Sequence, residues 1–426
     1  MSLIWRRLQL EWPAWLAVAF VALLPVRRAA EAPLSILALA LPFVLRNPAH
    51  RHRLRELAPL VIPLFLCFWI PMLASSFDSY LPDKSWEKTL AALRFPMAAL
   101  TLGILLQTAS LRWLVLRWCA YVLVFWAADG FFQLVVGFDV FGVQMHPDRL
   151  NALFVTKYQF YGPVLAMLSP LMLEYARRRW PAWAWVLAFS MVLGAVMISG
   201  MRAGWLAMFM VLATYMLLML RHENRELRRA SFAIPALALT VLAASYAISP
   251  IFQERIARTL AITQATEAAL NEASSLRVPI FRHALDMYRA HPVNGVGVRA
   301  FEEAYLEFAE PGDAHLANAR VDSEGRTRHG ATHAHNVVLE VMADTGTIGL
   351  VGLLAGFVIG YRRWRAQTPA QRQDAFPYVL ALALILFPLN SHFAIYGAYT
   401  SSLIWFLVGL WAATWRRPAM DDDEGA

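Results

Sequence analysis

The sequence predicts an all-α polytopic membrane protein with about twelve transmembrane helices and one large outward-facing loop that is itself helical. Its 426 residues are 59% hydrophobic and 16% charged, whereas a soluble protein of this length carries about 25% charged residues. The apolar residues gather in long runs, and a helix needs about 20 of them to cross the bilayer. One polar stretch, residues 249–335, interrupts this pattern.

The apolar runs order the chain into four expected parts. Residues 1–248 hold helices one to nine, residues 249–335 form the loop, residues 336–415 hold helices ten to twelve, and residues 416–426 form an acidic tail. The expected spans centre on residues 12–26, 33–46, 57–76, 87–107, 112–136, 158–176, 181–199, 203–220, 231–248, 336–361, 376–391 and 399–415.

Arginine-rich connections predict the orientation, because the short cytoplasmic loops of membrane proteins collect Lys and Arg. With twelve spans, the following arginines fall on one side: Arg46, Arg51, Arg53 and Arg55; Arg112 and Arg117; Arg177, Arg178 and Arg179; Arg221, Arg225, Arg228 and Arg229; Arg362, Arg363, Arg365 and Arg372; Arg416 and Arg417. Both termini are then cytoplasmic, and the loop faces outward, which is into the periplasm if the chain comes from a Gram-negative bacterium. Arg27 and Arg28 are a minor exception.

The net charge of +8 does not indicate a nucleic-acid partner, because the arginines lie in short loops beside membrane segments. The two cysteines, Cys67 and Cys119, lie inside apolar runs. They provide neither a disulfide framework nor the spacing of metal ligands.

An amphipathic helix is predicted over residues 276–290. Its apolar residues recur every four positions, at Leu276, Ile280, Ala284 and Tyr288, as in a helix that lies on the membrane-facing surface. The turn of residues 291–297 then ends it. Arg277 shares the inward-facing line, so it needs an anionic partner; the alternative is a side chain that snorkels to lipid headgroups.

The imidazole of His335 is the candidate catalytic group. It stands at the N-terminus of a membrane helix, whose positive dipole end disfavours the protonated ring, and a neutral imidazole can act as a general base. We expect His333, Asn336 and Glu340 to support it. The alternatives are a histidine that caps the helix or lines the interface, and a zinc site of His329, His333 and His335, which is weak because no Cys or Glu pattern accompanies it.

Three further arginines are candidate ligands for an anionic lipid headgroup, most simply a phosphate or pyrophosphate. Arg202 lies in a tight outer connection, and guanidinium groups bind phosphate oxygens bidentately. Arg94 is expected about two turns inside a membrane helix, which makes it a functional candidate unless it pairs with a buried acid such as Asp129. Arg299 belongs to the polar stretch and is assigned to the same ligand.

Five short motifs carry a resemblance to a known family. They are Ser199-Gly200-Met201-Arg202; Ser275-Leu276-Arg277; His291-Pro292-Val293-Asn294-Gly295-Val296-Gly297 with Phe301 behind it; His335-Asn336-Val337-Val338-Leu339; and Gly346-Thr347-Ile348-Gly349. Together these motifs, which lie between residues 190 and 355, resemble the O-antigen ligase and polymerase superfamily of bacterial membrane glycosyltransferases.

The resemblance implies a helical fold of the GT-C type in the bacterial inner membrane, with the active site facing the periplasm. It implies transfer of a polysaccharide from undecaprenyl pyrophosphate, the donor, to lipid A-core, the acceptor. Arg202 and Arg277 would hold the pyrophosphate, and His335 would assist the acceptor hydroxyl. No cofactor is implied. The lack of a pair of outward aspartates favours a metal-independent reaction, and direct displacement assisted by one base gives inversion at the anomeric carbon.

Other functions remain as alternatives. Chain length and the single large loop favour a ligase over a polymerase or a protein O-oligosaccharyltransferase, by analogy with the superfamily. A transporter of anionic lipids would use the same arginines for binding only, but should show internal symmetry and broken helices, and the sequence shows neither. A receptor or structural protein gives no reason to gather His335 and several arginines at one membrane face.

Overall fold

The chain forms two compact units, each built from segments that are distant in sequence. Unit 1 combines Met1–Pro33, Thr108–Thr263 and Pro377–Ile385, and unit 2 combines Leu34–Gln107, Gln264–Phe376 and Leu386–Ala426. The computed structural model describes residues 3–26, 29–154, 158–221, 232–260, 263, 274–317, 320–321, 327–391 and 393–415. The acidic tail and the arginines at positions 27, 28, 225, 228, 229, 416 and 417 lie outside these residues.

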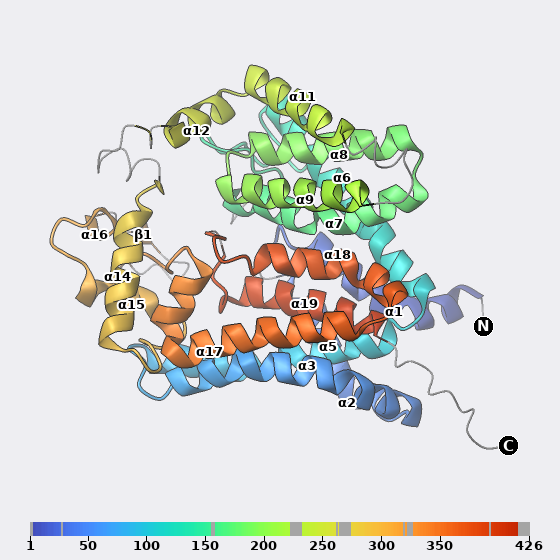
Figure 1. Cartoon of the computed structure of the whole chain (residues 1–426), viewed down its shortest axis with the longest axis horizontal. Coiled ribbons are helices and arrows are strands. Elements are labelled where there is room, and N and C mark those ends of the chain that lie inside the picture. The colour runs from blue at the N-terminus through green and yellow to red at the C-terminus, as the bar shows by residue number, and fades with distance from the viewer. Residues whose placement is uncertain are drawn as a thin grey trace. The chain divides into compact units, whose positions relative to one another are not determined.

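Unit 1 is a bundle of helices. Its elements are α1 (Leu3–Ala22), α6 (Ala109–Val136), the short η1 (Tyr158–Phe160), α7 (Tyr161–Arg179), α8 (Ala182–Ile198), α9 (Arg202–Leu220), α11 (Ala233–Ile248) and α12 (Pro250–Leu260). α7 is central, since it packs against α6, α8 and α9 (Figure 1). A Cβ on Gly204 would lie 3.0 Å from the backbone of Gly162, so glycine lets α9 approach α7 closely, as in many membrane helix pairs.

Unit 2 is built around four helices that pack in two pairs. α3 (Pro48–Ser75) runs beside α17 (Val337–Ala366), and α5 (Arg94–Leu105) runs beside α19 (Ala398–Thr414) (Figure 1). The other elements are α4 (Pro82–Ala91), α14 (Arg277–Ala290), α15 (Phe301–Phe308), α16 (Ala314–Ala317), β1 (Arg320–Val321) and β2 (Thr327–Arg328). α2 (Glu31–Val44) lies largely in unit 2, and α18 (Pro369–Ile385) contributes residues to both units.

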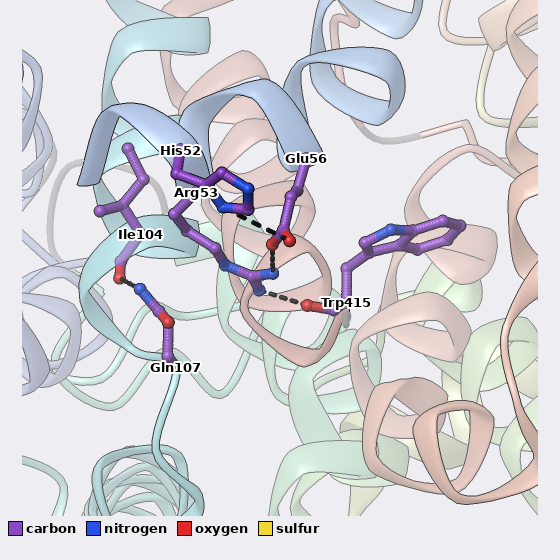
Figure 2. Close-up of polar contacts among 6 residues, drawn as sticks. All are labelled: His52, Arg53, Glu56, Ile104, Gln107 and Trp415. Carbon is purple, nitrogen blue, oxygen red and sulfur yellow. Dashed lines mark hydrogen bonds and ion pairs between the residues drawn. The ribbon is translucent and has the colours of Figure 1, made fainter. Parts of the chain in front are cut away.

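Arg53 joins the first turns of α3 to the end of α19. Its guanidinium donates to the carboxylate of Glu56 at 2.7 Å and to the backbone carbonyl of Trp415, the C-cap of α19 (Figure 2). The last carbonyls of a helix have no partner inside the helix, so this arginine satisfies one of them. Part of the arginine cluster at positions 46–55 is thus structural.

A small core holds α14 and α15 against the start of α17. It contains Ile280, Ala284 and Met287 of α14 and Phe301 and Tyr305 of α15. Ala334, just before α17, and Ala343, within α17, complete it. The hairpin β1–β2 is antiparallel and pairs Arg320 with Arg328 and Val321 with Thr327.

The helix α17 is broken at Gly346, whose φ of 61° and ψ of −154° lie outside the helical region. The turn of residues 291–297 docks on this break. The amides of Val296 and Gly297 donate to the carbonyls of Ala343 and Asp344, at 2.8 and 3.1 Å. On the other side, the amides of Thr347 and Ile348 donate to the carbonyls of residues 292 and 293, at 2.8 and 3.1 Å. The break deprives these backbone groups of hydrogen-bond partners within α17, and the backbone of the turn supplies partners in their place.

Each of the twelve expected spans overlaps a helix. In the part of the chain that the structure describes, five helical segments are long and apolar enough to cross a membrane: Pro48–Ser75, Pro82–Leu105, Ala109–Val136, Arg202–Leu220 and Val337–Ala366. The pair Pro235–Ile248 and Pro250–Leu260 is a sixth candidate, bent by 105°. The chain is therefore a polytopic membrane protein, and crossing by the remaining helices stays a prediction.

We expect Gly295→Ala to destabilise the protein far more than Gly312→Ala. Both glycines have positive φ, but a methyl group on Gly295 would lie 2.4 Å from the carbonyl oxygen of Ala343, whereas nothing lies within 4 Å of one on Gly312. The loss of stability in Gly312→Ala therefore measures only the cost of placing a side chain on left-handed backbone, about 1–2 kcal/mol. The measurement is the thermal unfolding midpoint of the purified protein in detergent, and equal shifts in the two variants would contradict the docked turn.

Candidate active site

His335 directly precedes the N-cap of α17. The cap is Asn336, whose side-chain oxygen accepts from the amides of Val338 and Leu339 at 3.0 and 3.1 Å. Asn336 therefore fixes the first turn of α17, and its supporting role in the site stays a prediction. The prediction that His335 lies at this helix start is confirmed.

The ring of His335 is oriented by a backbone carbonyl. Its Nδ1 lies 3.1 Å from the carbonyl oxygen of Ser391, and a nitrogen facing a carbonyl must carry the proton to donate. The neutral ring then bears its lone pair on Nε2, the arrangement a general base requires. The ring of His333 packs beside it, with centroids 3.9 Å apart, and the Nδ1 of His333 lies 2.9 Å from the hydroxyl of Thr332.

Arg277 reaches the same serine. It is the first residue of α14, and its Nη1 donates to the Ser391 hydroxyl at 2.9 Å. Ser391, in the connection between α18 and α19, therefore contacts the imidazole through its carbonyl and the guanidinium through its hydroxyl. Sequence reasoning missed Ser391, because nothing local marks it; only the tertiary fold brings it to residues 56 and 114 positions earlier.

Left-handed backbone gathers around these residues. Among the described residues, five non-glycine residues have positive φ: Ala152, Ser275, Leu276, Arg299 and His335. Ser275 and Leu276 directly precede Arg277, and Arg299 and His335 are themselves candidate site residues. Such residues cluster at functional sites, where the surrounding contacts hold the strain.

Glu340 and Asp344 form a buried acidic pair one turn apart on α17. Asp344 accepts from the backbone amide of Arg299 at 3.0 Å, and the charges of Arg299 and Lys84 act on it. Glu340 is fully buried, and its carboxylate lies beside the amides of residues 395 and 396 without a hydrogen bond of regular geometry among the described residues. The positive charge of Arg299 acts on both acids, and its assignment to pyrophosphate stays a prediction.

Arg202 is the first residue of α9 and belongs to unit 1. The positive charges of Arg255 and Arg258, both on α12, act on it. Arg202, Arg255 and Arg258 thus lie in unit 1, whereas Arg277 and His335 lie in unit 2.

Arg94 lies within the helical segment Pro82–Leu105, which is long and apolar enough to cross a membrane, as predicted. Two turn residues, Ala92 and Leu93, separate α4 from α5 within this segment, and Arg94 is the first residue of α5. Its guanidinium lies over the ring of Phe95, 5.2 Å from the ring centroid.

The inward face of α14 differs from the predicted one. The helix itself is confirmed, but Leu276 lies before it and is exposed, and Met287 rather than Tyr288 completes the buried line with Ile280 and Ala284. The prediction failed because the polar His283 also faces inward, where apolar spacing would not place it.

His283 is buried because Asp313 comes from a distant loop to meet it. The carboxylate of Asp313 accepts from the ring of His283 at 3.1 Å, the hydroxyl of Tyr305 at 3.0 Å and the amide of His315 at 2.7 Å. Burial alone would raise the pKa of Asp313, but these hydrogen bonds together lower it. The ring of His315 lies 2.8 Å from the carbonyl of Leu276, so the network reaches the backbone that positions Arg277.

No group of three or more His, Cys, Asp or Glu side chains in the described part of the chain could hold a metal ion. The zinc alternative placed His329 beside His333 and His335, but the Nδ1 of His329 lies 2.9 Å from the carbonyl of Leu316.

Residues 186–354 match the family model described as O-antigen ligase. This segment is therefore similar to the O-antigen ligase family. That segment includes every candidate site residue predicted from the sequence except Arg94. The match supports an enzymatic role of the ligase or polymerase type. A comparison with curated proteins gives no match.

We expect Asp313→Asn to lower the thermal unfolding midpoint at neutral pH, because an amide cannot accept from all three donors and an unsatisfied buried partner costs about 1–3 kcal/mol. The folded-state pKa of Asp313 is lowered, so its contribution is complete above the ordinary value of about 4 and disappears as the pH falls through the lowered pKa.

The matched control is Asp286→Asn, at a half-exposed ion pair with Arg289 on the same helix. Surface changes of this kind stay within about 0.5 kcal/mol. Equal losses in the two variants at neutral pH would contradict the role assigned to Asp313.

Proposed function

We propose that the protein is an O-antigen ligase. It transfers a polysaccharide from undecaprenyl pyrophosphate to lipid A-core during lipopolysaccharide biosynthesis, without a metal ion and with inversion at the anomeric carbon. The observation that carries the proposal is that Nδ1 of His335, just before α17, and Nη1 of Arg277, on α14, contact the same residue, Ser391. A base and a cation held together suit a reaction that removes a proton and releases an anion.

In the proposed step, the acceptor hydroxyl of lipid A-core attacks the anomeric carbon of the donor sugar. Its proton passes to Nε2 of His335 as the new carbon–oxygen bond forms. The bond from the anomeric carbon to the phosphate oxygen breaks, and its electron pair leaves with undecaprenyl pyrophosphate. Arg277 stabilises the charge that develops there, and Arg202, Arg94 and Arg299 remain proposed ligands of the same group.

The proposed topology places the reaction in the periplasm. It has twelve spans with both termini in the cytoplasm of a bacterial inner membrane protein, and a GT-C-type fold. The division into residues 1–248, 249–335, 336–415 and 416–426 belongs to this proposal. The arginines of the alternate connections support it.

One argument against a transporter no longer holds. The sequence suggested unbroken helices, yet α17 is broken at Gly346 and α11 and α12 meet at 105°, and transporters also use broken helices. The alternative therefore has to be decided by catalysis, because a transporter would bind the lipid carrier without releasing it from its glycan.

We expect His335→Asn to fold normally and to lose transfer activity by about 10²- to 10⁴-fold, the usual contribution of one general base. Asparagine tolerates the left-handed backbone of this position but provides no base. The assay is transfer by the purified protein from a lipid-linked glycan to lipid A-core, with the exposed His329→Asn as control. Near-normal turnover in His335→Asn would exclude it as the base, and His333 would be tested next.

A gene knockout distinguishes the ligase from the polymerase. Loss of a ligase leaves lipid A-core without polysaccharide, while long lipid-linked glycans accumulate. Electrophoresis of lipopolysaccharide and of the lipid-linked pool measures both. A knockout whose lipid A-core carries a single repeat unit would show that the protein is the polymerase instead.

A further inference from the structure

The helix α12 is held across the start of α9 in unit 1. α11 and α12 meet at Ser249 with a bend of 105°, and the Ser249 hydroxyl accepts from the amide of Phe252 at 3.2 Å. The buried ring of Phe252 packs edge-on against Trp205 of α9, with centroids 5.0 Å apart. This contact fixes the position of the next turn of α12.

That next turn places Arg255 against the connection that leads into α9. A Cβ built on Gly200 would lie 3.4 Å from Cγ and 3.7 Å from Nε of Arg255, so the arginine stem lies directly over this glycine. Gly200 has a φ of +70°, and Arg202 follows two residues later. The geometry therefore brings Arg255 to the connection that carries Arg202.

Arg255 is 8% exposed, and its Nε has no hydrogen-bond partner among the residues that the structure describes. No carboxylate of those residues forms an ion pair with it. A buried guanidinium is costly unless an anion neutralises it. Since Arg202 lies close enough for the two charges to repel each other, the arrangement suits an anion that binds both.

The neighbouring Arg258 differs in this respect. It lies one turn further along α12, is 43% exposed at its side chain, and forms an ion pair with Glu254. Its charge is already balanced within the helix, so it needs no further anion.

We propose that Arg202 and Arg255 form a clamp for the phosphate oxygens of a membrane-bound anion, in particular the pyrophosphate of the lipid carrier. The assignment to the carrier rests on the proposed function. Two planar guanidinium groups can each bind phosphate oxygens bidentately, and Arg202 begins a helix that is long and apolar enough to cross the membrane. An anionic phospholipid headgroup offers the same chemistry and is the competing source.

The test measures binding to the full-length protein in nanodiscs of neutral phosphatidylcholine. The probes are a polyprenyl pyrophosphate without sugar and phosphatidylglycerol, each titrated separately. We expect Arg255→Ala to weaken binding of polyprenyl pyrophosphate by about 10- to 100-fold, the loss of a hydrogen bond to a charged group. Arg255→Lys should recover part of this loss, because lysine restores the charge but not the fork.

The matched control is Arg258→Ala, which should bind polyprenyl pyrophosphate as the wild type does. Thermal unfolding of each variant checks that it is folded, and Arg255→Gln replaces Arg255→Ala if the shorter side chain destabilises α12. Unchanged binding of both probes in the folded Arg255 variants would overturn the clamp. Weakened phosphatidylglycerol binding with unchanged polyprenyl pyrophosphate binding would overturn its assignment to the carrier.

Failure of the proposed function can be distinguished from failure of the clamp. If wild-type protein binds polyprenyl pyrophosphate through Arg255 but transfers no glycan, the clamp stands and the ligase proposal falls. If it transfers a glycan equally well with Arg255→Ala and binds the probe unchanged, the ligase proposal stands and the clamp falls.

Discussion

The break in α17 at Gly346 is the constraint on which the arrangement of unit 2 depends. A helix inside a membrane protein cannot leave its backbone polar groups without partners, and four of them are satisfied by the turn of residues 291–297. The turn follows α14 directly, and α14 begins with Arg277. The segment of α17 before the break begins with Asn336 as cap and His335 ahead of it. One set of backbone hydrogen bonds thus fixes both helices that carry the candidate site.

Three of the left-handed residues, Leu276, Arg299 and His335, are held by contacts from elsewhere in the chain. The carbonyl of Leu276 meets the ring of His315, the amide of Arg299 meets the carboxylate of Asp344, and the ring of His335 meets the carbonyl of Ser391. A left-handed non-glycine residue persists only when its surroundings hold it. These contacts explain why residues such as Asp313, which touch no proposed substrate group, belong to the architecture of the site.

Sequence reasoning succeeded where the signal is local. Runs of apolar residues predicted the helices, the Asn-Gly-Val-Gly segment predicted a turn, and the position of His335 before a helix followed from the change in hydropathy. It failed where a distant residue decides the outcome. The sequence around His283 does not indicate that the Asp313 carboxylate will accept a hydrogen bond from it. The sequence around Ser391 does not indicate that Arg277 and His335 will contact it.

Some of the failures share a cause in helix breaks. A continuous apolar run predicted one helix around Arg94, and the segment Pro82–Leu105 contains it, but the run did not reveal the two turn residues, Ala92 and Leu93, that precede the arginine. Likewise, Gly346 leaves the helical region within a segment of helical composition, because the docked turn offers its neighbours other hydrogen-bond partners. Hydropathy measures whether a segment suits the membrane, and it carries little information on where a backbone ladder is interrupted.

The segment that matches the O-antigen ligase family is not a structural domain. Residues 186–354 supply α9 and α12 to unit 1 and α14, α15 and the first part of α17 to unit 2. The helix against which α17 packs, α3, lies outside the segment, as does Ser391. The matched residues therefore carry the candidate chemistry, while residues on either side of them along the chain hold that chemistry in place. A substitution at Ser391 or along the α3 contact can disturb His335 and Arg277 without altering any residue of the family signature.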